Sequence, residues 1–242
     1  MRKAYISIAA LLLCGSMLMA QTPANRTAKT TAADVLAQMP AAKQAAYNKL
    51  IGDLSSTGEE GVLMLVNMIN APGKGSNANV DYALSGLTHY VMAKGEENAR
   101  LVTAKAYLKA LEMVNERETK AFIIRQLQML GKDECIEVLA SYLNDEALSG
   151  PAARALAANG SEKAGQALVA ALKMRSGSSK TQKDVIRAIA DARVKEAETL
   201  LLTLQGASDP NMQKEVLYAL SCVGSSNSVS YTHLTLPTNS RV

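Results

Sequence analysis

Tryptophan is absent from the 242-residue chain, and Phe122 is its only phenylalanine. Sugar-binding sites use the broad faces of exposed aromatic rings as stacking platforms, so a carbohydrate site within this chain is not expected. Alanine, leucine and methionine supply much of the apolar content instead. These small and straight-chain residues favour helix, and they allow helices to approach one another closely.

Histidine is also scarce, with two in the whole chain. His89 falls in a helical pattern whose apolar face is formed by Leu84, Leu87 and Val91, and the spacing places the histidine well off that face. The sequence puts no second histidine and no motif serine or cysteine beside it, so a histidine-based metal site and nucleophilic catalysis both lack parts. We therefore expect an exposed histidine, with no metal and no catalytic residue.

An excess of positive charge is missing as well. Of the 26 basic residues, Arg2, Lys3 and Arg241 lie in the terminal segments treated below, which leaves 23 against 22 acidic residues. Such a chain has no basic stripe for phosphate contacts, so nucleic acid is not expected as a partner.

Adjacent acidic residues occur four times. A glycosidase would need two carboxylates flanking the scissile bond, but three of these pairs fall at expected helix N-termini. There the helix dipole stabilises negative charge by about 0.3–1 kcal/mol, and the fourth pair falls in a turn. We interpret all four as caps and solvated turns: Glu59-Glu60, Glu96-Glu97, Asp133-Glu134 and Asp145-Glu146.

The N-terminus has the pattern of a secretory signal over residues 1–20. Arg2 and Lys3 precede an apolar run over 6–13, and Ala20 ends a plausible cleavage site. The run is too short for a membrane anchor, which needs about twenty residues, and a lipoprotein signal would place a small residue before Cys14 where Leu13 stands. We expect cleavage after Ala20, a flexible leader over 21–30 and no membrane span in the mature chain. The protein would then be periplasmic, on the cell surface or secreted in a Gram-negative bacterium.

The last residues, 227–242, break with the composition before them: threonine is frequent and alanine is absent. The segment resembles translated read-through of a sequencing adapter, which makes it non-native, and the gene would then continue past Ser226. The alternative is an authentic strand or flexible tail that opens another domain. We leave the segment out of the fold argument.

A short helical pattern recurs about every thirty residues in the second half of the chain. A unit of that period cannot hide its apolar face alone and does so by stacking on its neighbours, so the pattern predicts an all-α solenoid of antiparallel helix pairs. Its four copies are Ile124-Arg125-Gln126-Leu127, Ala153-Arg154-Ala155-Leu156, Ile186-Arg187-Ala188-Ile189 and Leu217-Tyr218-Ala219-Leu220.

Apolar periodicity and helix-start residues predict twelve helices. Residues 31–116 read as irregular N-terminal repeats and residues 117–226 as regular ones, of which the last is incomplete. Expected caps are a capping box from Ser56 to Glu59, Asn115, Ser179 with Gln182, and Asp209 before Pro210. The ranges are 31–38, 41–54, 56–70, 79–93, 96–114, 117–130, 133–143, 151–158, 161–173, 179–191, 195–204 and 210–223.

The loop over 71–77 contains glycine, lysine and serine, yet it lacks the spacing of a phosphate-binding loop and joins two helices. No cofactor is expected. Cys135 and Cys222 fall on apolar helical faces about three units apart, and units that far apart do not meet in a stack. We expect two buried free thiols, although export would permit a disulfide. On the last helix, Val216, Leu217 and Leu220 form an apolar stripe with no following helix to cover it, so that helix is expected to fray.

The pattern resembles the HEAT-repeat family, in particular its short bacterial form, clearly over 117–224 and more loosely over 41–116. The family's arginine slot maps onto Arg125, Arg154 and Arg187, whereas Tyr218 departs from it. The resemblance implies an acidic partner near a helix start for each arginine, but the sequence shows no acid at one fixed offset. The arginines form either a ladder facing a partner or ties between repeats, with their stems packed over the helices.

Segments 54–64, 72–78 and 81–87 resemble the N-terminal repeat region of large exported proteins that end in a 3-keto-disaccharide hydrolase-type domain. This second resemblance implies that any catalysis belongs to a domain outside the chain, and it carries over no catalytic residue. We expect an exported scaffold for protein–protein or domain–domain contacts, as a fragment of a larger protein. The alternative is the non-catalytic part of a sugar-degrading hydrolase. The DNA past codon 226 would distinguish the two.

Overall fold

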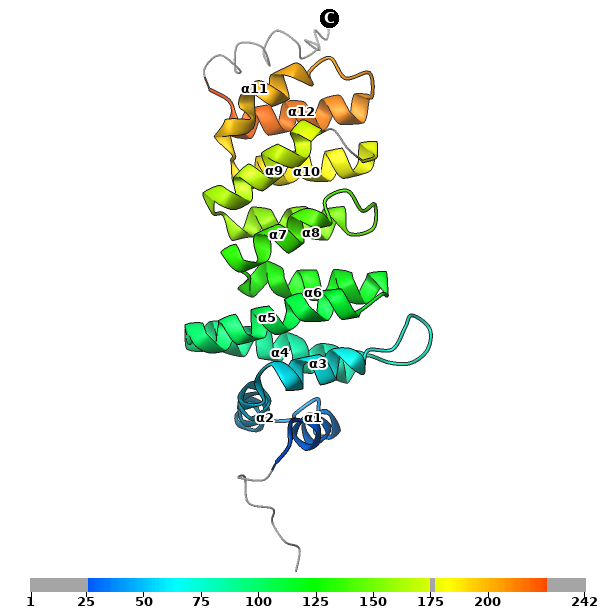
Figure 1. Ribbon diagram of the computed structural model, residues 1–242, viewed down its shortest axis with the longest axis vertical. Coiled ribbons are helices and arrows are strands. Elements are labelled where there is room, and N and C mark those ends of the chain that lie inside the picture. The colour runs from blue at the N-terminus through cyan, green and yellow to red at the C-terminus, as the bar shows by residue number, and fades with distance from the viewer. Residues whose placement is uncertain (1–25, 175–176, 226–242) are drawn as a thin grey trace, which may run out of the picture.

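The computed structural model describes residues 26–174 and 177–225. Over these residues the chain is all helical and forms one elongated stack, with the N-terminal helices at one end and α12 at the other (Figure 1). The predicted signal peptide, most of the leader and the predicted adapter-derived tail lie outside the described residues.

Twelve α-helices and two short 3₁₀ helices make up the described part of the chain. Their bounds are α1 Ala28–Ala37, α2 Gln44–Ser56, α3 Gly58–Asn67, α4 Ala78–Lys94, α5 Glu97–Met113, α6 Arg117–Leu130, η2 Asp133–Cys135, α7 Ile136–Ser141, α8 Ser149–Asn159, α9 Glu162–Met174, α10 Ser179–Ala192, η3 Lys195–Ala197, α11 Glu198–Thr203 and α12 Pro210–Val223.

The helices are arranged in two layers. Each even-numbered helix packs on the next even-numbered one from α2 to α12, with the closest packing from α6 onward. The other layer contains α1, α3 and α5, then η2, α7, α9 and α11. Because most contacts join neighbouring helices, the predicted all-α, repeat-like array of helix pairs is confirmed.

The burial pattern of the even layer explains this packing. In α6, two buried residues precede one exposed residue and two buried residues follow it, and the same order recurs in α8 and α10. A helix shows this pattern when its flanks pack on two neighbours, its inner side meets the second layer and a narrow strip remains open. We call the central residues the slot residues and the surface that they form the slot face: Ser85, Arg125, Arg154, Arg187 and Tyr218.

The helix bounds agree with the predicted ones to within a few residues. The largest difference concerns the second helix in two of the helix pairs. The helices expected over 133–143 and 195–204 each begin as a 3₁₀ turn, η2 or η3, before α7 or α11. Gly131 stands before the first of these turns, where an added Cβ would lie 2.6 Å from the Leu127 carbonyl oxygen and 2.8 Å from Cys135 Sγ. The chain thus enters the second helix through a contact that only glycine permits.

Of the four expected caps, one agrees with the structure and one is displaced by a residue. Asp209 caps α12 by accepting a hydrogen bond from Asn211 N at 2.9 Å, as predicted. At α10 the cap is one residue earlier than expected: Ser178 Oγ accepts from Thr181 N at 3.4 Å. A side-chain oxygen in this place satisfies one of the free N–H groups of the first helical turn.

The other two expected caps are wrong. Ser56 still belongs to α2, and its Oγ donates to the Asp53 carbonyl oxygen instead of capping α3. Gly58, with a φ of +62°, begins α3. The N-cap residue is therefore Thr57, whose hydroxyl donates to the Leu54 carbonyl oxygen and makes no capping bond. At α6 the N-cap residue is Glu116, not Asn115, and its side chain makes no capping bond.

The expectation that α12 lacks cover is also wrong. Val216 is 0% exposed and Leu220 is 1% exposed, because α12 packs closely on α10 and also on α11. Leu217 is half-buried. The buried stripe faces back into the stack rather than outward, so the basis for the expected fraying is removed.

Both thiols are free, as expected, but only Cys135 is buried; Cys222 is half-buried at the edge of α12. Within the ranges 26–174 and 177–225, no helix is long and apolar enough to cross a membrane.

Candidate functional site

The slot face is the feature that the repeats build most regularly. Arg125 on α6, Arg154 on α8 and Arg187 on α10 are all exposed, and Tyr218 on α12 is exposed next in the row. Ser85 is the half-buried first member on α4. The three arginines therefore come from successive helices of one layer.

Arg187 also ties one helix to the next. Its Nε lies 3.5 Å from Glu215 Oε2 on α12, yet the arginine side chain remains 63% exposed. An exposed pair of this kind contributes about 0–1 kcal/mol to stability. The pairing leaves most of the guanidinium accessible, so the two interpretations of the arginine row are compatible at this position.

Arg154 lies close to an acid on the next helix without forming an ion pair in the described part of the chain. A Cβ added to Gly150 would lie 3.5 Å from both Arg154 Nη1 and Asp184 Oδ2. Asp184 is already occupied, because it accepts from Ser149 Oγ at 2.6 Å and from Lys180 Nζ at 2.9 Å. Among the residues that the structure describes, the Arg154 guanidinium has no charged partner.

The acids follow a register that the sequence reading missed. Asp184 stands three residues before the slot residue Arg187, and Glu215 three residues before Tyr218. Each acid keeps its place relative to the slot of its own helix. Its offset from the preceding arginine varies, because the loops between repeats differ in length.

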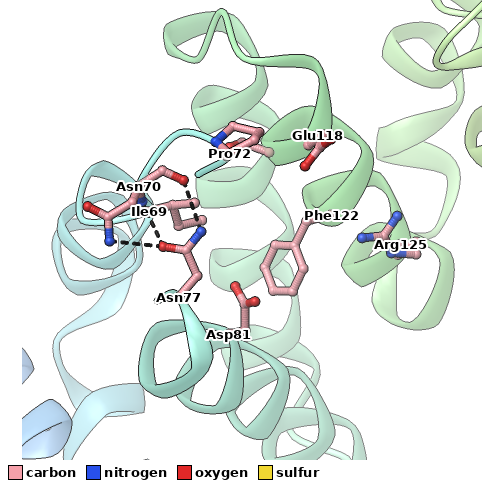
Figure 2. Close-up of a pocket in the computed structure, with 9 residues that line it drawn as sticks. Ile69, Asn70, Pro72, Asn77, Asp81, Glu118, Phe122 and Arg125 are labelled. Atoms are coloured by element: carbon pink, nitrogen blue, oxygen red, sulfur yellow. Dashed lines mark hydrogen bonds between the residues drawn. The ribbon is translucent and has the colours of Figure 1, made fainter. Parts of the chain in front are cut away.

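Arg125 differs from the other two because it lines a hollow of about 150 Å³. The hollow lies between the loop after α3, the start of α4 and the first half of α6 (Figure 2). Its lining residues are Ile69, Asn70, Pro72, Asn77, Asp81, Glu118, Thr119, Phe122 and Arg125.

A clasp between two asparagines fixes the loop beside the hollow. Asn77 Oδ1 accepts from Asn70 N at 2.7 Å and from Asn70 Nδ2 at 3.2 Å, while Asn77 Nδ2 donates to the Asn70 carbonyl oxygen at 2.9 Å. Asn70 Nδ2 also contacts the Ser76 carbonyl oxygen at 3.3 Å. The loop over 71–76 is thereby closed at its base, as the dashed lines in Figure 2 show.

Charge in the hollow is compensated only in part. Within the described residues, the side chains of Asp81, Glu118 and Arg125 form neither a hydrogen bond nor an ion pair with another residue. Burial raises the pKa of Asp81, and the nearby Arg125 charge opposes this rise only in part. The carboxylate of Asp81 is therefore partly desolvated, and Arg125 offsets the cost of its charge only in part.

The most strongly perturbed carboxylate lies elsewhere, at the junction of α5, α6 and η2. Arg100, 4% exposed, donates from Nη1 to Glu134 Oε1 and to the Leu130 carbonyl oxygen, both at 2.6 Å. Its Nη2 donates to Glu97 Oε1 at 2.7 Å, and Lys132 Nζ reaches Glu97 Oε2 at 2.7 Å. Perturbed groups often mark functional sites, but here every bond is internal and closes the C-terminus of α6.

Acid should weaken this junction. The bonds from Arg100 and then Lys132 lower the pKa of Glu97 from 4.5 to about 2. A lowered pKa contributes stability above pH 4.5 that is lost as the pH falls towards 2. We expect the urea midpoint of the wild-type protein to exceed that of a Glu97→Gln variant at neutral pH, with the difference closing between pH 4.5 and 2. A constant difference over that range would contradict this assignment.

The four acidic pairs are thus partly reinterpreted. Asp145 does hold a turn, since its Oδ1 accepts from the backbone nitrogens of Ala147 and Leu148 at 2.8 and 3.1 Å. Glu97 and Glu134 do lie in the first turns of α5 and η2, as expected, and they also hold the buried Arg100. Of the other acids, Glu59 pairs with Lys109 and Asp133 with Lys163.

His89 is exposed, as expected. Across the described ranges no group of three or more histidine, cysteine, aspartate or glutamate side chains is placed to hold a metal ion. Two further hollows lie beside Tyr90 and Val102, and beside Val169 and Lys173. Neither combines opposed charges with an aromatic ring as the Asp81 hollow does.

The sequence reading missed Asp81 and Phe122 as members of a site. A signal was present: Ala83-Leu84-Ser85-Gly86-Leu87 resembles the slot pattern in the preceding helix of the same layer, with a half-buried residue at its centre. Asp81 stands four residues before Ser85 and Phe122 three residues before Arg125, so each lies about one turn before a slot residue. Comparisons with protein families and with curated proteins find no match to this chain.

Proposed function

We propose that this protein is an exported, non-catalytic scaffold of the HEAT-like repeat class, which binds a protein partner, or another domain of its own chain, through the slot face. The row of exposed slot residues on α6, α8, α10 and α12 carries the proposal. Their flanking residues are committed to the core, whereas the slot side chains are not required for packing.

The residue types on the slot face suit this role. Arginine and tyrosine are enriched among the residues that dominate binding energy at protein interfaces. Guanidinium groups recognise carboxylates through paired hydrogen bonds. Arg154, which has no charged partner in the described part of the chain, and Arg187, which is mostly exposed, are open to such contacts. The partner is therefore expected to present carboxylates to these two arginines.

Photo-crosslinking tests the proposal. The full chain would carry benzoylphenylalanine at position 154 on the slot face or, as the control, at exposed position 170 on α9 in the other layer. We expect a discrete adduct from position 154 and none from position 170. Mass analysis then separates a partner protein from another domain of the same chain.

Charge reversal sharpens the test. The changes Arg125→Glu and Arg187→Glu should reduce the adduct at position 154 at least tenfold while the helical circular dichroism stays that of the wild-type protein, because both side chains are exposed. Equal adducts from both layers, or an adduct that survives the charge reversal, would reject the slot face as the binding surface.

A further inference from the structure

We infer that the hollow lined by Asp81, Glu118 and Phe122 is a binding pocket for one cationic side chain, a lysine or arginine of the partner that contacts the slot face. The inference rests on the proposed function in one respect: the cationic side chain is taken to belong to the partner protein that binds the slot face. The chemistry of the pocket is argued from its own residues.

The charges lining the hollow favour a cation. Two carboxylates, Asp81 and Glu118, and one guanidinium, Arg125, line the hollow, so its formal charge is negative. None of the three side chains forms a hydrogen bond or an ion pair with another described residue. The contrast with the neighbouring repeats is informative: Asp184 is held by Ser149 and Lys180, and Glu215 pairs with Arg187. Of the acids placed before a slot residue, Asp81 alone is left half-buried without a partner among the described residues, as a site for an external cation requires.

The apolar part of the hollow fits the rest of such a side chain. Ile69 and Pro72 supply aliphatic walls, and the Phe122 ring lies between Asp81 and Arg125 in the view of Figure 2. An ammonium or guanidinium group near a ring face is attracted by its electron density. The ring and the two carboxylates would thus hold the charged head, while the aliphatic walls cover the stem.

Size and rigidity narrow the ligand further. At about 150 Å³ the hollow lies below the roughly 300–1,000 Å³ of pockets that enclose whole small molecules, so one side chain is the better fit. The Asn70–Asn77 clasp holds the Pro72 wall in place before binding. A wall that is already ordered reduces the entropy lost on association.

The pKa of Asp81, which burial raises, agrees with this assignment. The carboxylate is disfavoured in its charged form when the hollow is empty, because burial outweighs the attraction of Arg125. A bound cation would reverse this by adding a second opposite charge to that of Arg125.

The inference is tested by NMR titration of the full chain with capped amino acids. The probes are N-acetyl-lysine methylamide and N-acetyl-arginine methylamide, with N-acetyl-norleucine methylamide as the uncharged control of similar shape. We expect saturable amide shifts confined to the 69–81 and 118–125 segments, with the charged probes binding at least tenfold more tightly than norleucine. Equally tight binding of the norleucine probe, or shifts scattered over the stack, would overturn the assignment.

Variants separate the pocket from a general effect of charge. Asp81→Asn should weaken lysine binding at least tenfold, and Phe122→Leu should weaken it while keeping an apolar wall. Asp191→Asn, which removes an exposed acid on α10, is the matched control and should have no effect. If Asp81→Asn binds as well as the wild-type protein, the pocket assignment fails.

The two proposals fail in different ways. Lysine binding at the hollow without a crosslink from position 154 would reject the scaffold proposal and keep the pocket. A crosslink without lysine binding would do the reverse.

Discussion

Replacing Arg100 by alanine is expected to lower the free energy of unfolding by about 3–5 kcal/mol, the usual cost of removing one partner from a buried charged network. The guanidinium is 4% exposed and joins three parts of the chain: Glu97 on α5, the Leu130 carbonyl oxygen at the end of α6, and Glu134 on η2. Without it, Glu134 keeps its charge in a half-buried place with no counter-charge. The Leu130 carbonyl loses its donor as well.

Urea unfolding followed by circular dichroism measures this loss. The matched control is Arg117→Ala, at an exposed position in the first turn of α6, which should change stability by less than about 0.5 kcal/mol. A loss below about 1 kcal/mol for Arg100→Ala would show that water replaces the guanidinium bonds without penalty.

A second variant separates the net contribution of the charged network to stability from the cost of leaving one of its charges unpaired. Replacing Arg100 and Glu134 together by Met and Leu removes both charges of the pair, and such apolar replacements are often neutral or stabilising. The double variant should therefore be more stable than Arg100→Ala. If it is equally unstable, the bond to the Leu130 carbonyl oxygen accounts for most of the loss.

The helices could be predicted from the sequence because apolar residues recur with the period of a helix throughout the chain. In α6, for example, Ile123, Ile124 and Leu127 are buried where the pattern placed them. Local caps were less predictable, because Ser56 and Asn115 can satisfy their hydrogen bonds in several ways. Which way prevails depends on where the preceding helix ends.

Long-range polar contacts could not be predicted from one sequence. Arg100 lies on the same helical face as Thr103, Tyr107 and Leu111, so a charge on a buried face was visible in the pattern. Its partner Glu134, however, is 34 residues away, and the pairing depends on how η2 turns back towards α5. The Asp81 hollow is similar, because it exists only where the loop after α3 lies against α6.

For α12, the apolar stripe was predicted correctly but its packing partner was not. The stripe of Val216 and Leu220 was assigned to a helix that would follow, whereas α10 and α11 bury it from behind. The last described helix of the even layer has a neighbour of its own layer on one flank, α10, and the second layer behind it. A periodic stripe alone does not say which flank it faces.

The stacked architecture predicts how far along the chain a cavity in the core destabilises the helices. Leu156, 0% exposed in the middle of α8, packs in a helix that contacts α6 and α10. Leu156→Ala is expected to lower the free energy of unfolding by about 2–5 kcal/mol, the range for truncating a buried leucine. Because each unit contacts only its neighbours, the loss should be felt first from α6 to α10 and least in α1 to α3.

Amide hydrogen exchange measures this distribution, and Leu54→Ala supplies the matched control. Leu54 is also 0% exposed but lies in α2, near the other end of the stack. Its truncation should speed exchange in α1 to α4 and leave α8 to α12 close to the wild-type rates. The two variants remove the same atoms from equally buried places, so only position along the stack differs between them. Uniform acceleration in both variants would mean that the helices unfold as a single cooperative unit, in which case nearest-neighbour stacking does not govern the stability of this chain.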